Sequence, residues 1–89
     1  MKKVTRRSIL ELLQGILARQ GKPTVINEDA TLREIGFRSL DFSELALRVE
    51  SESGRTLEFD GAELRGIETV RDVLSFMEKA VAGKAKVGQ

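Results

Sequence analysis

The sequence predicts an all-α protein: a small bundle of three to four helices, with a long loop between the first two long helices. Three observations indicate this fold class. Apolar residues recur at helical spacing in three stretches, residues typical of helix ends bound each stretch, and no useful length alternates as a strand would. With 89 residues there is room for one domain. We expect that domain over residues 1–82 and a disordered tail over 83–89.

The first helix is expected over residues 5–20. Thr5 is the expected N-cap, and Gly21, ahead of Pro23, is the expected residue just past the helix end. One side of this helix is apolar and should face the core, with Leu10 at its edge. Its members are Ile9, Leu12, Leu13, Ile16 and Leu17.

Residues 21–38 form a long connection rich in Gly, Pro, Asn, Asp and Thr. Within it, Leu32 and Ile35 lie three apart, so we expect one helical turn at residues 31–35 that anchors the loop to the core. Gly36 then allows a tight turn of the backbone. Loops of this length are uncommon in small domains unless they are anchored or functional.

The second long helix is expected to begin at Ser39 and to end near Ser53, with Gly54 as its stop signal. Its buried stripe has members at i, i+3, i+4 and i+7, namely Phe42, Leu45, Ala46 and Val49. Leu40 and Leu47 project almost opposite to that stripe. They are either ordinary surface leucines or a small docking patch with a charged rim.

The last third of the chain predicts one short turn and one helix. The turn is expected at residues 60–64, where glycines exclude a long helix, with Leu57, Leu64 and Ile67 as anchors. Thr69 is the expected N-cap of the final helix, and Asp72 suits its N-terminal dipole. The core face of that helix has Phe76 at its flank and consists of Val70, Val73, Leu74, Met77, Ala80 and Val81.

The amino-acid composition argues against several classes of protein function. The chain has no Cys and no His, so it lacks disulfides, thiolate metal sites and the commonest general base, and we expect neither an enzyme nor a metal site. No apolar stretch approaches the ~18 residues of a membrane span, and no signal peptide is evident. We therefore expect a monomeric cytoplasmic protein.

Charge is unevenly distributed. Residues 1–27 carry six basic groups and one acidic group, residues 28–68 carry five basic and eleven acidic, and residues 69–89 carry four basic and two acidic. A partner that approaches the acidic middle should itself be basic, unless the charges are only solvated surface. The acidic middle and the absence of Trp and Tyr argue against nucleic-acid binding.

The stretch from Leu32 to Leu45 resembles the acyl carrier protein family around its 4′-phosphopantetheine attachment serine. In that family a Leu-Gly pair precedes an Asp-Ser-Leu triplet, which an acidic residue and then a Glu-Leu pair follow. Ile35-Gly36 is close to the family's Leu-Gly. The resemblance extends from about Arg7 to Ala82, and the matching residues of the motif are Ser39, Leu40, Asp41, Glu44 and Leu45.

The resemblance implies a non-catalytic carrier. A phosphopantetheinyl transferase would attach 4′-phosphopantetheine from coenzyme A to Ser39, whose place at a helix N-terminus suits a phosphodiester. The arm would carry an acyl group as a thioester, with the sulfur supplied by the cofactor. The implied partners are acyl-loading and acyl-transfer or condensing enzymes of fatty acid or polyketide biosynthesis. The bundle interior would shelter a short acyl chain.

The resemblance also implies that partners dock on the helix that follows the serine. The residues expected to contact them are Arg38, Leu40, Asp41, Glu44, Leu47 and Arg48. Arg38 departs from the family, which usually has Asp there, and this cation either weakens recognition by a standard transferase or fits a dedicated one. Arg48 lies four residues after Glu44, so an ion pair between them would mute the acidic face. Both features favour a specialised carrier.

Three alternatives remain open from the sequence. Ser39 could be only an N-cap, worth about 1 kcal/mol to its helix. The protein could be a carrier-like helical interaction module that is never modified, an interpretation to which Arg38 lends support. The basic N-terminus and Arg38 also permit a small nucleic-acid-binding domain, although the acidic middle would repel phosphates.

Overall fold

The computed structural model describes residues 4–22, 27–57 and 61–82. Within these ranges the chain is an all-α bundle, as predicted, and contains no β-strand beyond an isolated bridge between Thr31 and Thr69. The predicted tail at 83–89 lies outside the described residues. The helices are α1 (Arg6–Arg19), α2 (Leu32–Ile35), α3 (Ser39–Ser53), α4 (Gly61–Arg65) and α5 (Val70–Ala82).

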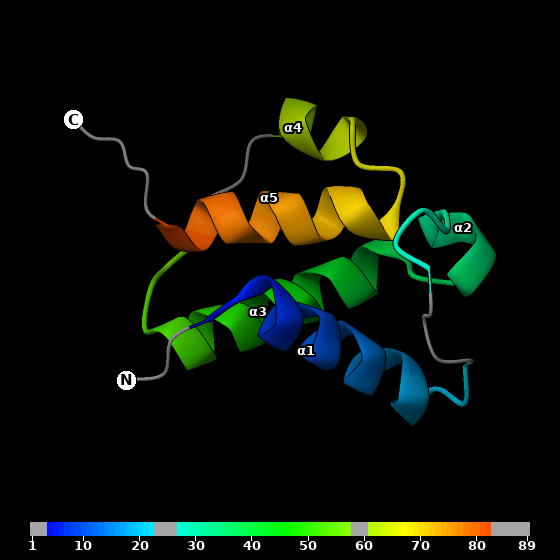
Figure 1. Cartoon of the computed structure of the whole chain (residues 1–89), viewed down its shortest axis with the longest axis horizontal. Coiled ribbons are helices and arrows are strands. Elements are labelled where there is room, and N and C mark those ends of the chain that lie inside the picture. The colour runs from blue at the N-terminus through cyan, green and yellow to red at the C-terminus, as the bar shows by residue number, and fades with distance from the viewer. Residues whose placement is uncertain (1–3, 23–26, 58–60, 83–89) are drawn as a thin grey trace.

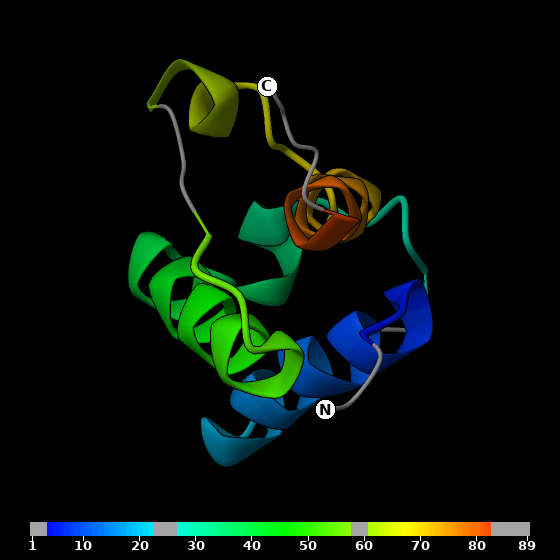
Figure 2. The ribbon, with the colours of Figure 1, turned by 90° about the vertical axis from the view of Figure 1, so that its left-hand side faces the viewer.

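Three long helices enclose the core (Figures 1 and 2). α3 and α5 begin at the same end of the bundle and run in the same general direction, whereas α1 runs the opposite way (Figure 1). α2 lies at the end where α1 finishes and α3 and α5 begin, and α4 lies outside the three-helix core (Figure 2). The fully buried side chains are Ile9, Leu13, Ile16, Leu17, Leu45, Val49, Val70, Val73, Leu74 and Met77.

The predicted ends of α1 are confirmed, and so is the helical turn expected at residues 31–35. Thr5 caps α1 through reciprocal bonds with Ser8, and Gly21 follows the helix with a φ of 74°. Thr31 caps α2 in the same manner, with Glu34 as its partner. The connection between α1 and α2 therefore begins and ends at helix ends that the local sequence specifies.

Gly36 turns the chain between α2 and α3. It ends α2 in the left-handed conformation, with a φ of 72°, which costs other L-residues about 1–2 kcal/mol. A Cβ there would also lie 3.0 Å from Nζ of Lys22, and that ammonium donates a hydrogen bond to the Gly36 carbonyl. The positive φ is therefore what requires glycine here, since the nearby Lys22 side chain is flexible, and the Lys22 bond links the end of α1 to the turn before α3.

The N-terminus of α5 is capped as predicted. The Asp72 amide donates to Oγ1 of Thr69 over 3.2 Å, and Oδ2 of Asp72 accepts from the amides of Glu68 and Thr69 over 3.0 and 3.1 Å. These backbone donors stabilise the carboxylate, so they lower the pKa of Asp72 below its ordinary value.

A pH dependence of stability follows from this cap. Because the folded-state pKa of Asp72 is lowered, its contribution is fully present above its unfolded pKa of about 3.9 and is lost as the pH falls through the lower folded value. We expect wild type to exceed Asp72→Asn in free energy of unfolding at pH 6, and the difference to shrink below about pH 4. Urea unfolding of both proteins across pH 2–7 measures this. A difference that stays constant with pH would contradict it.

Loop residues 27–31 are fastened to α5 by backbone bonds and ion pairs. Leu32 N donates to the Glu68 carbonyl over 2.9 Å, and the amides of Val70 and Arg71 donate back to the loop carbonyls of Ala30 and Glu28 over 3.0 and 2.8 Å. We call this contact between residues 28–32 and 68–71 the loop–α5 seam. It fixes α2 at one end of the bundle.

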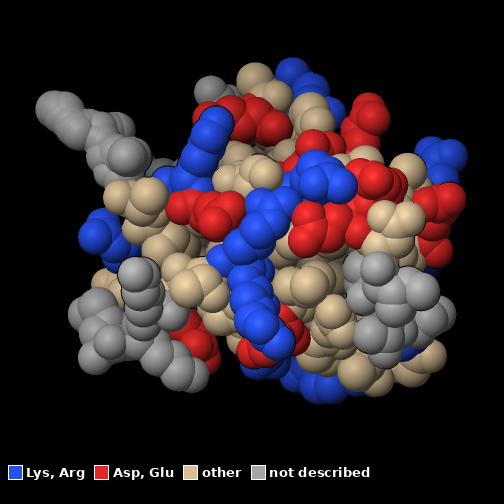
Figure 3. Space-filling view, in the orientation of Figure 1, with Lys and Arg blue, Asp and Glu red and all other residues tan. Residues whose placement is uncertain are grey.

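Ion pairs between α1, the loop and α5 lie in the same region as the seam. Arg6 bonds to Glu28 over 2.8 Å and to Glu78 over 3.0 Å, and Arg71 bonds to Asp29 over 2.7 Å. The bond from Arg6 lowers the pKa of Glu28. Basic and acidic side chains are accordingly interleaved on the face formed by α1 and α5 (Figure 3). Such exposed pairs contribute little individually, and here they supplement the backbone bonds of the seam.

Candidate functional site

Ser39 is exposed and occupies the first position of α3. The N-cap is Arg38, so the interpretation of Ser39 as an N-cap is wrong. The Arg38 side chain contains no hydrogen-bond acceptor atom, so it cannot cap the backbone amides of α3 itself. The cap is completed instead by Asp41, whose Oδ2 accepts a hydrogen bond from the Arg38 amide over 2.8 Å. Within the described part of the chain, Ser39 forms no side-chain hydrogen bond. Its hydroxyl is therefore accessible and has no capping role.

Asp41 was expected on the outward surface, and this placement is corrected. The residue is only 7% exposed, and its Oδ1 accepts from Nε2 of Gln20 over 2.6 Å. Asp41 thus holds the start of α3 and the end of α1 together. Its position three residues after the N-cap, which favours an acidic side chain, was the sequence signal for this role.

Loss of Asp41 should weaken the end of the bundle that carries Ser39. Asp41→Ala removes the partners of two donors, and we expect it to lower the free energy of unfolding by about 2–4 kcal/mol, since each bond to a carboxylate contributes about 1.5–3 kcal/mol. Ser43→Ala, at an exposed position of the same helix, is the control and should change stability by less than about 0.5 kcal/mol. Urea unfolding monitored by circular dichroism measures both. Equal midpoints for the two variants would contradict the capping role.

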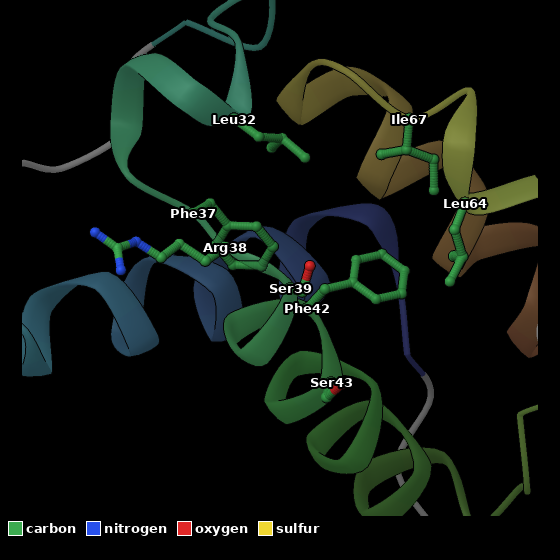
Figure 4. Close-up of a pocket in the computed structure, with 8 residues that line it drawn as sticks. All are labelled: Leu32, Phe37, Arg38, Ser39, Phe42, Ser43, Leu64 and Ile67. Atoms are coloured by element: carbon green, nitrogen blue, oxygen red, sulfur yellow. The ribbon is translucent and has the colours of Figure 1, made fainter. Parts of the chain in front are cut away.

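A cavity of about 260 Å³ opens beside Ser39 (Figure 4). Its walls come from α2 and the turn after it, from the first turns of α3, and from the α4–α5 region. The lining is mostly apolar and consists of Leu32, Phe37, Arg38, Ser39, Phe42, Ser43, Leu64 and Ile67. The Arg38 guanidinium points away from Leu64 and Ile67 (Figure 4). The cavity is therefore an apolar recess with two serines on its α3 side.

Phe42 and Leu64 line this recess, and Phe42 also packs against the core. Phe42 was expected in the buried stripe of α3, but it is only half-buried and its ring lies 5.9 Å from that of Phe76. Leu64, expected as an anchor of the short turn, is also half-buried. α4 lies outside the three-helix core (Figure 2). The helical pattern of α3 alone therefore could not show that a recess lies between α3 and α4.

The side of α3 opposite the core carries Leu40, Glu44, Leu47 and Arg48, which we call the outer face of α3. Leu40 and Leu47 are 83% and 65% exposed, as their helical positions predicted. Arg48 donates from Nε and Nη2 to Oε2 of Glu44 over 3.1 and 2.9 Å, so the expected pair between these residues forms. Arg19 of α1 bonds to the same oxygen. That contact joins two helices, and no spacing within one helix could have revealed it.

No protein-family model matches the chain, and no curated protein matches its sequence. Among solved structures, the chain is similar to an acyl carrier protein from Thermotoga maritima, with a TM-score of 0.65 and 25% sequence identity over 86% of this chain and 91% of that chain. The fold is therefore that of an acyl carrier protein, in agreement with the resemblance of residues 32–45. None of the described helices combines the length and apolar character of a membrane span.

Proposed function

We propose that the protein is an acyl carrier protein in which Ser39 holds 4′-phosphopantetheine through a phosphodiester. The arm carries an acyl group as a thioester on its terminal sulfur, and partner enzymes load and unload that group. The chain itself performs no catalysis in this scheme. The observation that carries the proposal is an accessible Ser39 at the start of α3, whose side chain makes no hydrogen bond with the described residues and which lies beside an apolar recess in a protein of this fold.

The residues around Ser39 fit such a cofactor. The hydroxyl is exposed, so a transferase can reach it. A phosphodiester at the first position of α3 would face the positive end of a 15-residue helix, and Arg38 would add a neighbouring cation. The recess of about 260 Å³ falls just below the range of about 300–1,000 Å³ that is usual for small-molecule pockets. A short acyl group is therefore the cargo that the recess favours.

The direct test is the intact mass of the protein after incubation with coenzyme A and a broad-specificity phosphopantetheinyl transferase. We expect a gain that equals one phosphopantetheine per chain. A control carrier is treated in parallel to show that the transferase is active. No gain by this protein, under conditions that modify the control, would overturn the proposal and favour an unmodified interaction module.

A further inference from the structure

The acidic groups beside Ser39 are occupied by contacts within the protein. Asp41 is buried, and both of its oxygens accept hydrogen bonds from the chain. Glu44 is shared by Arg19 and Arg48, which approach the same carboxylate oxygen. Neither carboxylate is available as an isolated negative charge. The acidic middle of the sequence therefore does not give α3 an acidic outer face.

The basic groups beside Ser39 are in excess. Arg38 is exposed and, within the described ranges, forms no side-chain hydrogen bond or ion pair. Arg19 and Arg48 share a single carboxylate, so their group keeps one net positive charge, and their side chains are 57% and 42% exposed. Arg38 lies two residues before Leu40, Arg48 directly follows Leu47, and Arg19 reaches Glu44 between the two leucines. A partner thus meets apolar side chains with a positive rim.

We propose that this outer face binds a transferase whose carrier-binding surface is apolar with an acidic rim. This polarity is the reverse of the one predicted from the charge blocks of the sequence. The inference rests on the proposed function, because it assumes that a phosphopantetheinyl transferase modifies Ser39. Leu40 and Leu47, seven residues apart on α3, would make the apolar contacts with the transferase. Carboxylates of the transferase would pair with Arg38 and with Arg48.

The transferase is the partner for which charge matters most. It meets the protein before modification, when Arg38 has no anion attached beside it. The phosphodiester on Ser39 adds one negative charge that offsets Arg38, which leaves only the net charge of the Arg19–Glu44–Arg48 group. Later partners would therefore meet a weaker positive rim. Such a difference suits release of the transferase after the reaction.

The test exchanges charges on both proteins. A transferase of known carrier-binding surface is prepared with a basic rim and with an acidic rim, and kcat/KM for modification is measured at low and moderate salt. Wild type should react about tenfold faster with the acidic form, because complementary charges raise association rates by 10-fold or more. Arg38→Glu should reduce or reverse this preference, and added salt should weaken it.

Arg7→Glu is the matched control, because it makes the same charge change on an exposed residue at the far end of α1. It should keep the wild-type preference. A control carrier with an acidic docking helix, used at saturating concentration and high salt where the rim charges are screened, verifies that both transferase forms are active. Modification of wild type without preference, or with preference for the basic form, would overturn the inference while the proposed function stands. Absence of modification by either form would overturn both.

Nucleic acid is the competing ligand for a positive surface. Fluorescence anisotropy with a labelled DNA duplex, at the same salt concentrations, separates the two. We expect no difference between wild type and Arg38→Glu. Salt-sensitive binding of the duplex that Arg38→Glu abolishes would assign the positive rim to a polyanion and overturn the inference.

Discussion

Ser39→Ala is expected to abolish modification by coenzyme A and transferase, whereas Ser43→Ala is expected to leave it intact. Both serines are exposed residues of α3 that line the same cavity, one helical turn apart. Only Ser39 stands at the first position of the helix, where unpaired amides and the helix dipole favour a phosphodiester. Intact-mass measurement of the two variants beside wild type gives the result. A mass gain that persists in Ser39→Ala would place the attachment elsewhere.

The same variant tests whether Ser39 has any structural role. Because its side chain makes no hydrogen bond with the described residues, Ser39→Ala should change the free energy of unfolding by less than about 0.5 kcal/mol. A capping serine would lose about 1 kcal/mol. Loss of modification at unchanged stability would therefore come from loss of the hydroxyl itself. A stability loss of the capping size would contradict the assignment of the cap to Arg38 and Asp41.

The largest effect on stability is expected from Leu45→Ala. Leu45 is fully buried in the core on the side of α3 that faces α1 and α5. Its truncation should lower the free energy of unfolding by about 2–5 kcal/mol, from lost burial and the cavity that remains. Small domains have only about 5–15 kcal/mol in total, so the loss is a large fraction. Thermal and urea unfolding measure it.

Leu47→Ala is the matched control for this substitution. It removes the same atoms from the same helix two residues later, but Leu47 is 65% exposed. We expect a change below about 0.5 kcal/mol, because little apolar surface returns to water. If Leu47→Ala lost as much stability as Leu45→Ala, the assignment of the inner and outer faces of α3 would be wrong.

Much of the fold could be predicted because its determinants are local. The caps at Thr5 and Thr69 and the stop at Gly54 each depend on residues within one turn, and all three are confirmed. Apolar periodicity likewise gave the core sides of the three long helices. Local signals of this kind need no knowledge of how the helices pack.

The charge pattern of the site could not be predicted because it depends on packing. Asp41 looked like a surface carboxylate, since nothing in the sequence shows that Gln20 of α1 lies beside it. The second arginine at Glu44 also comes from α1. Net charge over a block of residues counts every carboxylate equally, whereas the folded chain hides some and pairs others. The expected basic partner followed from that count.

The loop–α5 seam has a consequence for motion. Leu32, whose amide donates to the Glu68 carbonyl, belongs to the seam, and Phe37, its neighbour in the cavity wall, is buried against the core. Displacement of α2 that widens the recess must break the seam, whereas the contacts of α1 with α3 and α5 do not involve α2. The amides of Leu32, Val70 and Arg71 should then exchange with solvent together, as one cooperative unit. Adjustment to a larger guest is thereby confined to one end of the protein.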